Sequence, residues 1–212
     1  CSGGGNQTMY SGAFDERHKA VVPVCSVGTY QAYLGAACCM CEVVPRAMSY
    51  TEEWGILSLV APRALMLINA TRDGFQFSVG EAQKSLAKAQ HIFGLYGQKK
   101  KTRHGVFESK HDYNQPMRES MYGWMTLHLK GEGDGAPIAE PKFETEDAET
   151  LRCFPGDSRP ESFVTVPQFA AAEMQKILEK RPTPQHVEAW ESAETLMRES
   201  LPRTLGGFPR TK

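Results

Sequence analysis

The sequence predicts an α/β fold with a largely parallel sheet, because short apolar runs that suit strands alternate with longer amphipathic segments that suit helices. Residues 64–70 (Ala-Leu-Met-Leu-Ile-Asn-Ala) are apolar almost throughout, which is typical of a strand covered on both faces. Residues 79–96 follow with apolar side chains at helical spacing. A second strand-like run at 102–108 and a further helix after it repeat this unit.

The chain before this unit predicts a helix, a strand and an irregular segment. Residues 3–13 suit a short helix that ends near Gly12. Residues 20–24 (Ala-Val-Val-Pro-Val) suit a buried strand, and Pro23 belongs at the end or the edge of such a strand. Residues 27–48 show no clean period, so we expect a loop excursion that covers a pocket.

Two helices begin at sequences that match a capping box, in which a serine is followed three residues later by a glutamate. The first pair predicts a helix over residues 49–60, which ends before Pro62, and the second pair opens the helix at 79–96. The pairs are Ser49 with Glu52 and Ser78 with Glu81. Pro116 opens one more helix, whose shared face carries Met117, Met121, Trp124, Met125 and His128.

The strands account for only part of a sheet. Three strands with two apolar faces leave an open edge, so we expect further strands of the same domain upstream of Cys1. After Leu129 the composition changes to Gly, Pro and acidic residues, as in a linker. We predict an α/β domain over 1–130, a linker over 131–166 and a helical extension over 167–212 that leads to a further module. The helices of that extension are predicted at 167–180 and 185–201.

Composition excludes several partner classes. The chain has 212 residues and a formal net charge of −1, so no global field favours nucleic acid or an anionic membrane. No apolar run is long enough to span a bilayer. The cysteines do not form two pairs at zinc-ribbon spacing, and we expect free thiols, no metal and no cofactor. A disulfide between Cys25 and the cluster Cys38-Cys39-Met40-Cys41 is the alternative.

The first residues, Cys1-Ser2-Gly3-Gly4-Gly5, suit a nucleophilic serine on a sharp turn into a helix. Such a turn is strained and needs small neighbours, as in the G-x-S-x-G pattern. Gly4 stands two places after Ser2, whereas the glycine expected two places before it would lie outside these residues. The backbone N–H of Gly3 is a candidate donor to an oxyanion.

An acyl-transfer serine needs a base for its proton and a carboxylate that orients the base. Asp73 follows the strand at 64–70, and His111 follows the strand at 102–108. Both therefore lie at strand ends, in the chain order Ser2, Asp73, His111. We expect these three side chains to converge.

Each of these residues also has a plainer interpretation. Ser2 could be an ordinary helix N-cap, and Asp73-Gly74 a simple turn. A single histidine is usually a surface or core residue, but His111 lies in a polar loop after a strand, next to Asp112 and Tyr113.

Cys1 permits a different enzyme class. An amidohydrolase that uses its N-terminal residue as nucleophile employs the free amine as base. That class is built from antiparallel sheets, whereas this chain predicts a parallel α/β arrangement.

Taken together, four stretches resemble the acetyl xylan esterase-like branch of the α/β-hydrolases, which is related to the dienelactone hydrolases and the prolyl-oligopeptidase-like serine hydrolases. They are Cys1–Thr8, Ala61–Ile68, Asp73 and Lys110–Tyr113, and the similarity covers residues 1–130. It implies an α/β-hydrolase fold, of which this chain holds the C-terminal part of the catalytic domain.

The resemblance also implies a function. Ser2 would be the nucleophile, His111 the base and Asp73 its partner, cleaving carboxylic esters such as acetyl groups on plant or algal polysaccharide. It implies a secreted or periplasmic setting, and it makes Cys1, Glu42 and Tyr113 candidate pocket residues. The alternative is a catalytically inactive hydrolase-like module that binds carbohydrate or a partner.

Overall fold

The computed structural model of the chain describes residues 1–36, 44, 46–156, 158–181 and 183–205. It divides into two units, Cys1–Lys142 and Phe143–Lys212. The first unit contains the sheet, and the second contains two helices and the chain that leads to them. Each unit is described separately below.

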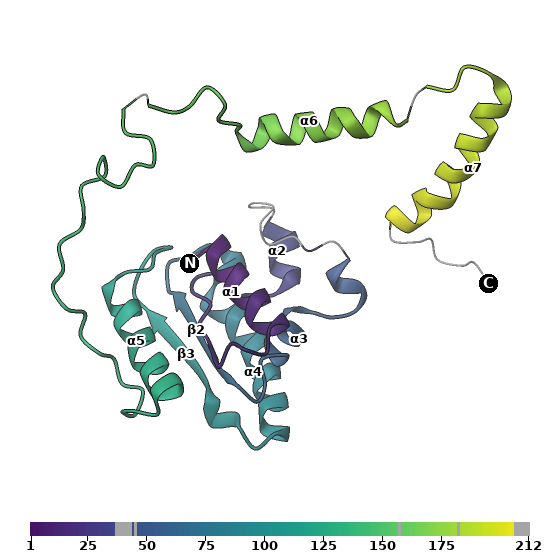
Figure 1. Cartoon of the computed structure of the whole chain (residues 1–212). Helices are drawn as coiled ribbons and strands as arrows, with labels where there is room; N and C mark the ends of the chain where they lie inside the picture. The colour runs from purple at the N-terminus through teal and green to yellow at the C-terminus, as the bar shows by residue number, and fades with distance from the viewer. Residues whose placement is uncertain (37–43, 45, 157, 182, 206–212) are drawn as a thin grey trace. The chain divides into compact units, whose positions relative to one another are not determined.

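The sheet of the first unit has three parallel strands in the order β1-β2-β3 (Figure 1). They are β1 (Ala20–Val21), β2 (Ala64–Ala70) and β3 (Thr102–Phe107). β2 lies in the centre, and every one of its residues is buried, as its apolar sequence predicts. The register pairs Leu65 with Thr102 and Ala70 with Phe107.

The predicted strand at 20–24 is only partly regular. The ladder to β2 covers Ala20 and Val21, and the chain returns to it at Val24, which pairs with Ile68. The interruption falls at Pro23, which has no N–H to donate, although its carbonyl accepts from the N–H of Ile68 at 3.2 Å.

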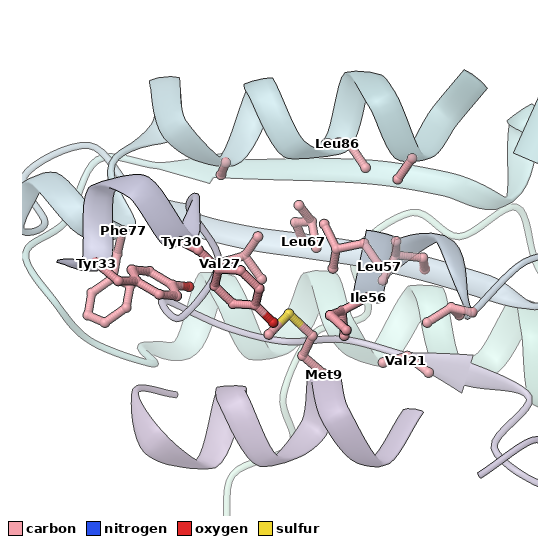
Figure 2. Close-up of a cluster of buried hydrophobic side chains, with 14 of the residues drawn as sticks. Met9, Val21, Val27, Tyr30, Tyr33, Ile56, Leu57, Leu67, Phe77 and Leu86 are labelled. Atoms are coloured by element: carbon pink, nitrogen blue, oxygen red, sulfur yellow. The ribbon is translucent and has the colours of Figure 1, made fainter. Parts of the chain in front are cut away.

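Helices cover both faces of the sheet (Figure 1). α1 (Gly3–Phe14), α3 (Glu53–Ser58) and α4 (Val79–Leu95) pack on one face, where Leu65 and Leu67 of β2 point. Figure 2 shows the side chains of this cluster, with Met9 of α1 and Leu86 of α4 on opposite sides of it. Both α1 and α4 begin at the carboxyl edge of the sheet.

α5 (Gln115–Met125) covers the other face, with Met117 and Trp124 packed against Met66 and Ile68. A π-helical turn, Thr126–Lys130, continues it. The chain after this turn stays on α5, because the guanidinium of Arg118 binds the carboxylate of Glu140 at 2.8 Å. Part of the stretch predicted as linker is therefore packed against the sheet unit.

Two predicted helix starts are found, each with one cap bond. Ser78 accepts a hydrogen bond from the N–H of Glu81 at 3.4 Å, and Asn114 accepts one from Met117 at 3.3 Å. The reverse half of the predicted Ser78–Glu81 capping box does not appear, because the carboxylate of Glu81 binds Thr29 and Lys84 instead.

The prediction for residues 49–60 was wrong at its start. α3 begins at Glu53, and Glu52 is its N-cap without a side-chain bond. Ser49 ends a short 3₁₀ helix and donates its hydroxyl to the carbonyl of Arg46 at 2.7 Å, so it is not a cap. Glu53 is fully buried and accepts from the hydroxyl of Tyr33, and this contact fixes the first turn of α3 in the core.

The prediction of an irregular excursion over 27–48 was also wrong in part, because α2 (Tyr30–Ala36) lies within it. Thr29 caps this helix by accepting from the N–H of Ala32 at 3.1 Å. Tyr30 and Tyr33 are buried one turn apart. The cap at Thr29 and the Tyr-x-x-Tyr spacing are the local signals of this helix, which is too short to show a longer apolar period.

The second unit contains α6 (Val166–Glu179) and α7 (Val187–Thr204), close to the predicted ranges. Neither helix has a buried residue. Within the part of the chain that the structure describes, no helix is both long and apolar enough to cross a membrane.

Candidate active site

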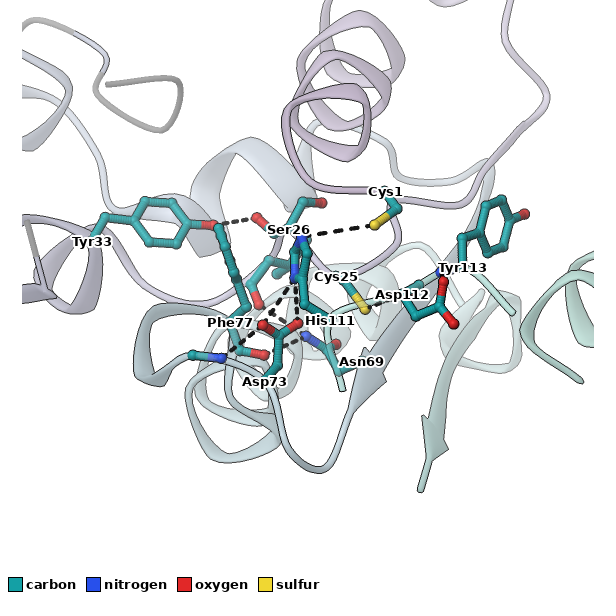
Figure 3. Close-up of polar contacts among 12 residues, drawn as sticks. Cys1, Cys25, Ser26, Tyr33, Asn69, Asp73, Phe77, His111, Asp112 and Tyr113 are labelled. Carbon is teal, nitrogen blue, oxygen red and sulfur yellow. Dashed lines mark hydrogen bonds and ion pairs between the residues drawn. The ribbon is translucent and has the colours of Figure 1, made fainter. Parts of the chain in front are cut away.

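Asp73 and His111 meet at the carboxyl edge of the sheet. β2 ends at Ala70 and β3 at Phe107, so the loops that follow these neighbouring parallel strands leave the sheet side by side. Nδ1 of His111 lies 2.9 Å from both carboxylate oxygens of Asp73 (Figure 3). The Asp73 side chain is 3% exposed and that of His111 38%, so the acid is covered while the imidazole faces solvent.

The carboxylate of Asp73 is fixed from its own loop. The N–H of Gly74 donates to Oδ1 at 2.7 Å, and this bond fixes the orientation of the carboxylate. An ionised carboxylate accepts from the Nδ1–H tautomer of the imidazole, which leaves Nε2 as an acceptor. The plain-turn interpretation of Asp73-Gly74 therefore does not describe the whole role of this aspartate.

Ser2 stands at the start of α1 in a strained conformation. Its φ is 54° and its ψ is −132°, a region that residues with a side chain seldom adopt. Its carbonyl accepts from Gly5 at 2.8 Å and Asn6 at 3.0 Å, which closes the first turn of the helix. Its hydroxyl makes no cap bond, so the ordinary N-cap interpretation does not hold.

The start of α1 reaches the imidazole. Sγ of Cys1 lies 3.8 Å from Nε2 of His111, the ring nitrogen that Asp73 does not contact (Figure 3). The residue directly before Ser2 is therefore in contact with the nitrogen that would accept a proton. Among the described residues no hydrogen bond joins the hydroxyl of Ser2 to this ring, and the N–H of Gly3 is also unused there.

Phe77 supports the other side of the imidazole. The two rings are stacked, with centroids 5.6 Å apart and planes at 28°. Phe77 ends the short 3₁₀ helix Phe75–Phe77, which directly follows the Asp73 loop. The edge of Tyr33 packs on Phe77 in turn, at 5.7 Å.

Cys25 is a site residue that the sequence did not predict. It follows the β1 segment with φ of 45°, is fully buried, and donates its thiol to the carbonyl of Asp112 at 3.4 Å. Burial raises the pKa of this thiol to about 11, so it stays protonated at neutral pH. No motif marks it in the sequence, because its place depends on the strained turn after Pro23.

A thiol, a carboxylate and an imidazole are therefore close together. Ligand atoms of Cys25, Asp73 and His111 lie within 4.8 Å of one another, a set that could hold a metal ion. A metal on Nδ1 would have to displace the bond to Asp73 and deprotonate the buried thiol. The hydrogen-bonded pair is the arrangement that these contacts favour.

A cavity of about 580 Å³ lies between α1, β1 and α5. Cys1 and Tyr113, both predicted as pocket residues, line it together with Gly4, His18 and Met121. Glu42, the third predicted pocket residue, lies outside the described residues, as do Cys38, Cys39 and Cys41.

No protein-family model matches the chain, and no curated protein matches its sequence. Solved structures do match. They include a carbohydrate esterase family 15 (CE15) glucuronoyl esterase from Caldicellulosiruptor kristjansonii, with a TM-score of 0.54 and 15% identity over 68% of this chain and 46% of that chain. Methylesterase BT1017 matches with a TM-score of 0.58 and 20% identity, over 92% of this chain and 40% of that chain.

A third similar structure is a mutant glucuronoyl esterase from Sporotrichum thermophile in complex with methyl 4-O-methyl-beta-D-glucopyranuronate. Its TM-score is 0.50 and its identity 13%, over 68% of this chain and 46% of that chain. The chain thus spans less than half the length of each of these enzymes. None of them is an acetyl xylan esterase, so the predicted branch is not confirmed. The predicted fold class is confirmed, because over the part it covers this chain has the α/β-hydrolase fold of these esterases.

Proposed function

We propose that this chain carries the catalytic residues of a serine esterase that hydrolyses carboxylic esters on polysaccharide. The observation that carries the proposal is the contact chain from Asp73 through the two nitrogens of His111 to Cys1, next to Ser2. Ser2 is the nucleophile, His111 the general base and Asp73 the residue that orients it. The strained start of α1 and the cavity beside it support the same assignment.

The reaction has two halves, acylation of Ser2 and hydrolysis of the acyl-enzyme, and the same groups act in both. Nε2 of His111 takes the proton of the Ser2 hydroxyl as its oxygen attacks the ester carbonyl. The N–H of Gly3 donates to the oxyanion, and a second donor comes from elsewhere in the site. The alcohol leaves with the proton from His111, and water then hydrolyses the acyl-enzyme by the same route in reverse.

Two acyl chemistries compete for this site. The resemblance to the acetyl xylan esterase-like branch favours an acetyl group on a sugar hydroxyl. The similar solved structures favour an ester in which the sugar supplies the acid rather than the alcohol, as in the methyl glucuronate complex. We propose the acetyl ester first, because the motif stretches that carry the resemblance include Ser2, Asp73 and His111 themselves.

The test is active-site labelling of the intact protein with a fluorophosphonate probe. We expect stoichiometric labelling of wild type and none of Ser2→Ala, with Ser58→Ala, whose hydroxyl donates to the carbonyl of Trp54 within α3, as a control that labels normally. Equal labelling of Ser2→Ala and wild type would refute the assignment. Unlabelled wild type is then supplied with acetylated xylan and with methyl glucuronate, and the faster hydrolysis identifies the acyl chemistry.

An inactive carbohydrate-binding module is the other outcome of this test. It predicts that wild type takes up no probe yet retains binding to polysaccharide. In that case wild type and Ser2→Ala would bind polysaccharide equally, with the same circular dichroism spectrum and the same stability.

A further inference from the structure

β2 carries one polar residue at a position that is fully buried. Asn69 follows Leu67 on the same face of the strand, towards the layer formed by α1, α3 and α4, and it is 0% exposed. A buried amide that lacks partners costs about 1–3 kcal/mol, so a strand that needed only packing would have an apolar residue here.

The amide of Asn69 holds two loops. Nδ2 donates to the carbonyl of Val27 at 3.2 Å and to the carbonyl of Phe77 at 3.0 Å. Figure 3 labels Asn69 and Phe77 beside His111. Val27 belongs to the turn that leaves β1 after Cys25, and Phe77 to the segment that follows Asp73. One side chain at the end of the central strand therefore ties together the chain segments on both sides of the candidate site.

The orientation of this amide is also determined. Nε2 of His104, on β3, lies 3.0 Å from Oδ1 of Asn69. Burial lowers the pKa of His104, so its ring is neutral and donates from Nε2. The oxygen of Asn69 thus faces β3, and both of its N–H groups face the two loop carbonyls.

Phe77 links the amide of Asn69 to the imidazole of His111. Its carbonyl accepts from that amide, and its ring is stacked on His111 at 5.6 Å. The segment Asp73–Phe77 also carries the carboxylate that binds Nδ1. Displacement of Phe77 would therefore move a ring contact and the loop of the orienting acid together.

We propose that Asn69 is the positioning residue of this site: it fixes the Asp73–Phe77 segment, and through the ring of Phe77 it fixes the imidazole of His111. The proposal rests on the proposed function for its effect on rate, but not for its effect on the geometry of His111. Asn69 touches no substrate and takes no part in proton transfer.

A matched control exists on the same β1 loop. Ser85 of α4 is buried and donates its hydroxyl to the carbonyl of Gly28 at 2.5 Å, next to Val27 but without a bond to Phe77. Ser85→Ala therefore removes a buried side-chain donor from the loop after β1. It leaves the Phe77 segment bonded.

The experiment compares Asn69→Leu with Ser85→Ala in the intact protein. The first readout is the chemical shift of the ring protons of His111, which the ring current of Phe77 displaces and which Phe77→Leu calibrates. The second is kcat/KM for an activated acetyl ester. We expect the His111 shifts of Asn69→Leu to move towards those of Phe77→Leu and kcat/KM to fall about 10- to 100-fold, while Ser85→Ala leaves both unchanged.

If Asn69→Leu does not fold, His104→Leu gives the same test, because it removes only the donor that orients the amide. Loss of stability with His111 shifts like those of wild type, or equal changes in both variants, would overturn the proposal. Moved shifts in a protein whose wild type shows no Ser2-dependent hydrolysis would support the positioning role while refuting the proposed function.

Discussion

The two units of this chain form helices by the same local rules but put them to different use. In Cys1–Lys142, α4 buries residues along its length, and β2 is buried throughout. In Phe143–Lys212, α6 and α7 have sound caps and amphipathic sequences, yet neither buries a residue. Local signals are thus enough to start and stop a helix, whereas a site needs segments from distant parts of the sequence packed at one edge of a sheet.

The largest expected effect is a loss of kcat without a loss of the fold. Asp73→Asn should lower kcat for ester hydrolysis by about 10⁴-fold, because an amide no longer fixes the imidazole tautomer, as in serine proteases. The fold should persist, since the amide oxygen can still accept from the N–H of Gly74.

Asp147→Asn is the control from the second unit, because its carboxylate also accepts from nearby backbone N–H groups. We expect it to leave kcat unchanged. Steady-state rates and circular dichroism of both variants make the measurement, and equal rates for Asp73→Asn and wild type would refute the role of Asp73.

The next effect tests where burial contributes to stability. Leu67→Ala in β2 removes a fully buried side chain from the larger core cluster, and we expect it to lower the free energy of unfolding by about 2–5 kcal/mol. Leu178→Ala in α6 truncates a side chain that is 55% exposed, and we expect a change within about 0.5 kcal/mol.

Urea denaturation measures the change in the free energy of unfolding. Hydrogen exchange, measured for each peptide, shows which segment loses protection. A large loss from Leu178→Ala would mean that α6 packs against a partner. That result would break the contrast between the two units.

One cysteine of each unit gives a further contrast, while Cys1 of the first unit is exposed like Cys153. Cys25 is fully buried with a pKa raised to about 11, whereas Cys153 in the second unit is exposed. At pH 8 the thiolate fraction of Cys25 should be about 100-fold below that of an ordinary thiol, in addition to its burial, so we expect alkylation of Cys153 and protection of Cys25.

The sign of the pH effect follows from the same shift. The folded state holds the thiol proton of Cys25 more tightly than the unfolded state does, so this group stabilises the protein below pH about 9 and loses that contribution as the pH rises towards about 11. Mass spectrometry of alkylated peptides measures the protection, with a denatured sample as the control. Rapid labelling of Cys25 in the native protein would contradict its burial.

Much of the fold could be predicted from the sequence, because its signals are local. The range of β2 was predicted to the residue, since seven consecutive buried residues leave little choice. Ser78 predicted the start of α4 correctly because a cap bond spans only three residues. The late start of the helix predicted from Ser49 depends on the buried contact of Glu53 with Tyr33, which no local pattern contains.

The site divides in the same way. Asp73 and His111 were predictable as residues after strand ends, since neighbouring parallel strands deliver their following loops to one edge. Cys25, Phe77 and Asn69 were not, because each acts through a contact across the fold. In the sequence Asn69 is one polar residue in an apolar run, and only the carbonyls that it binds reveal why it is there.

The smallest expected effect concerns the helix caps. The capping box predicted at Ser78 is half formed, because the carboxylate of Glu81 is drawn to Thr29 and Lys84. The box at Thr165 and Gln168 is complete, and both of its residues are exposed or half-buried. In the first unit, tertiary contacts thus draw the Glu81 side chain away from its capping box. In the second unit, the Gln168 side chain stays bonded within the box of its own helix.

Ser78→Ala should therefore cost the first unit about 1 kcal/mol of unfolding free energy, because α4 is packed and a frayed first turn also loosens its contacts. Thr165→Ala should leave that free energy unchanged and instead speed amide exchange in the first turn of α6, where no packing retains the helix. Hydrogen exchange read separately for the two segments decides between these outcomes. If Thr165→Ala weakened the first unit as much as Ser78→Ala does, the caps of α6 would have to be supported by contacts beyond their own helix.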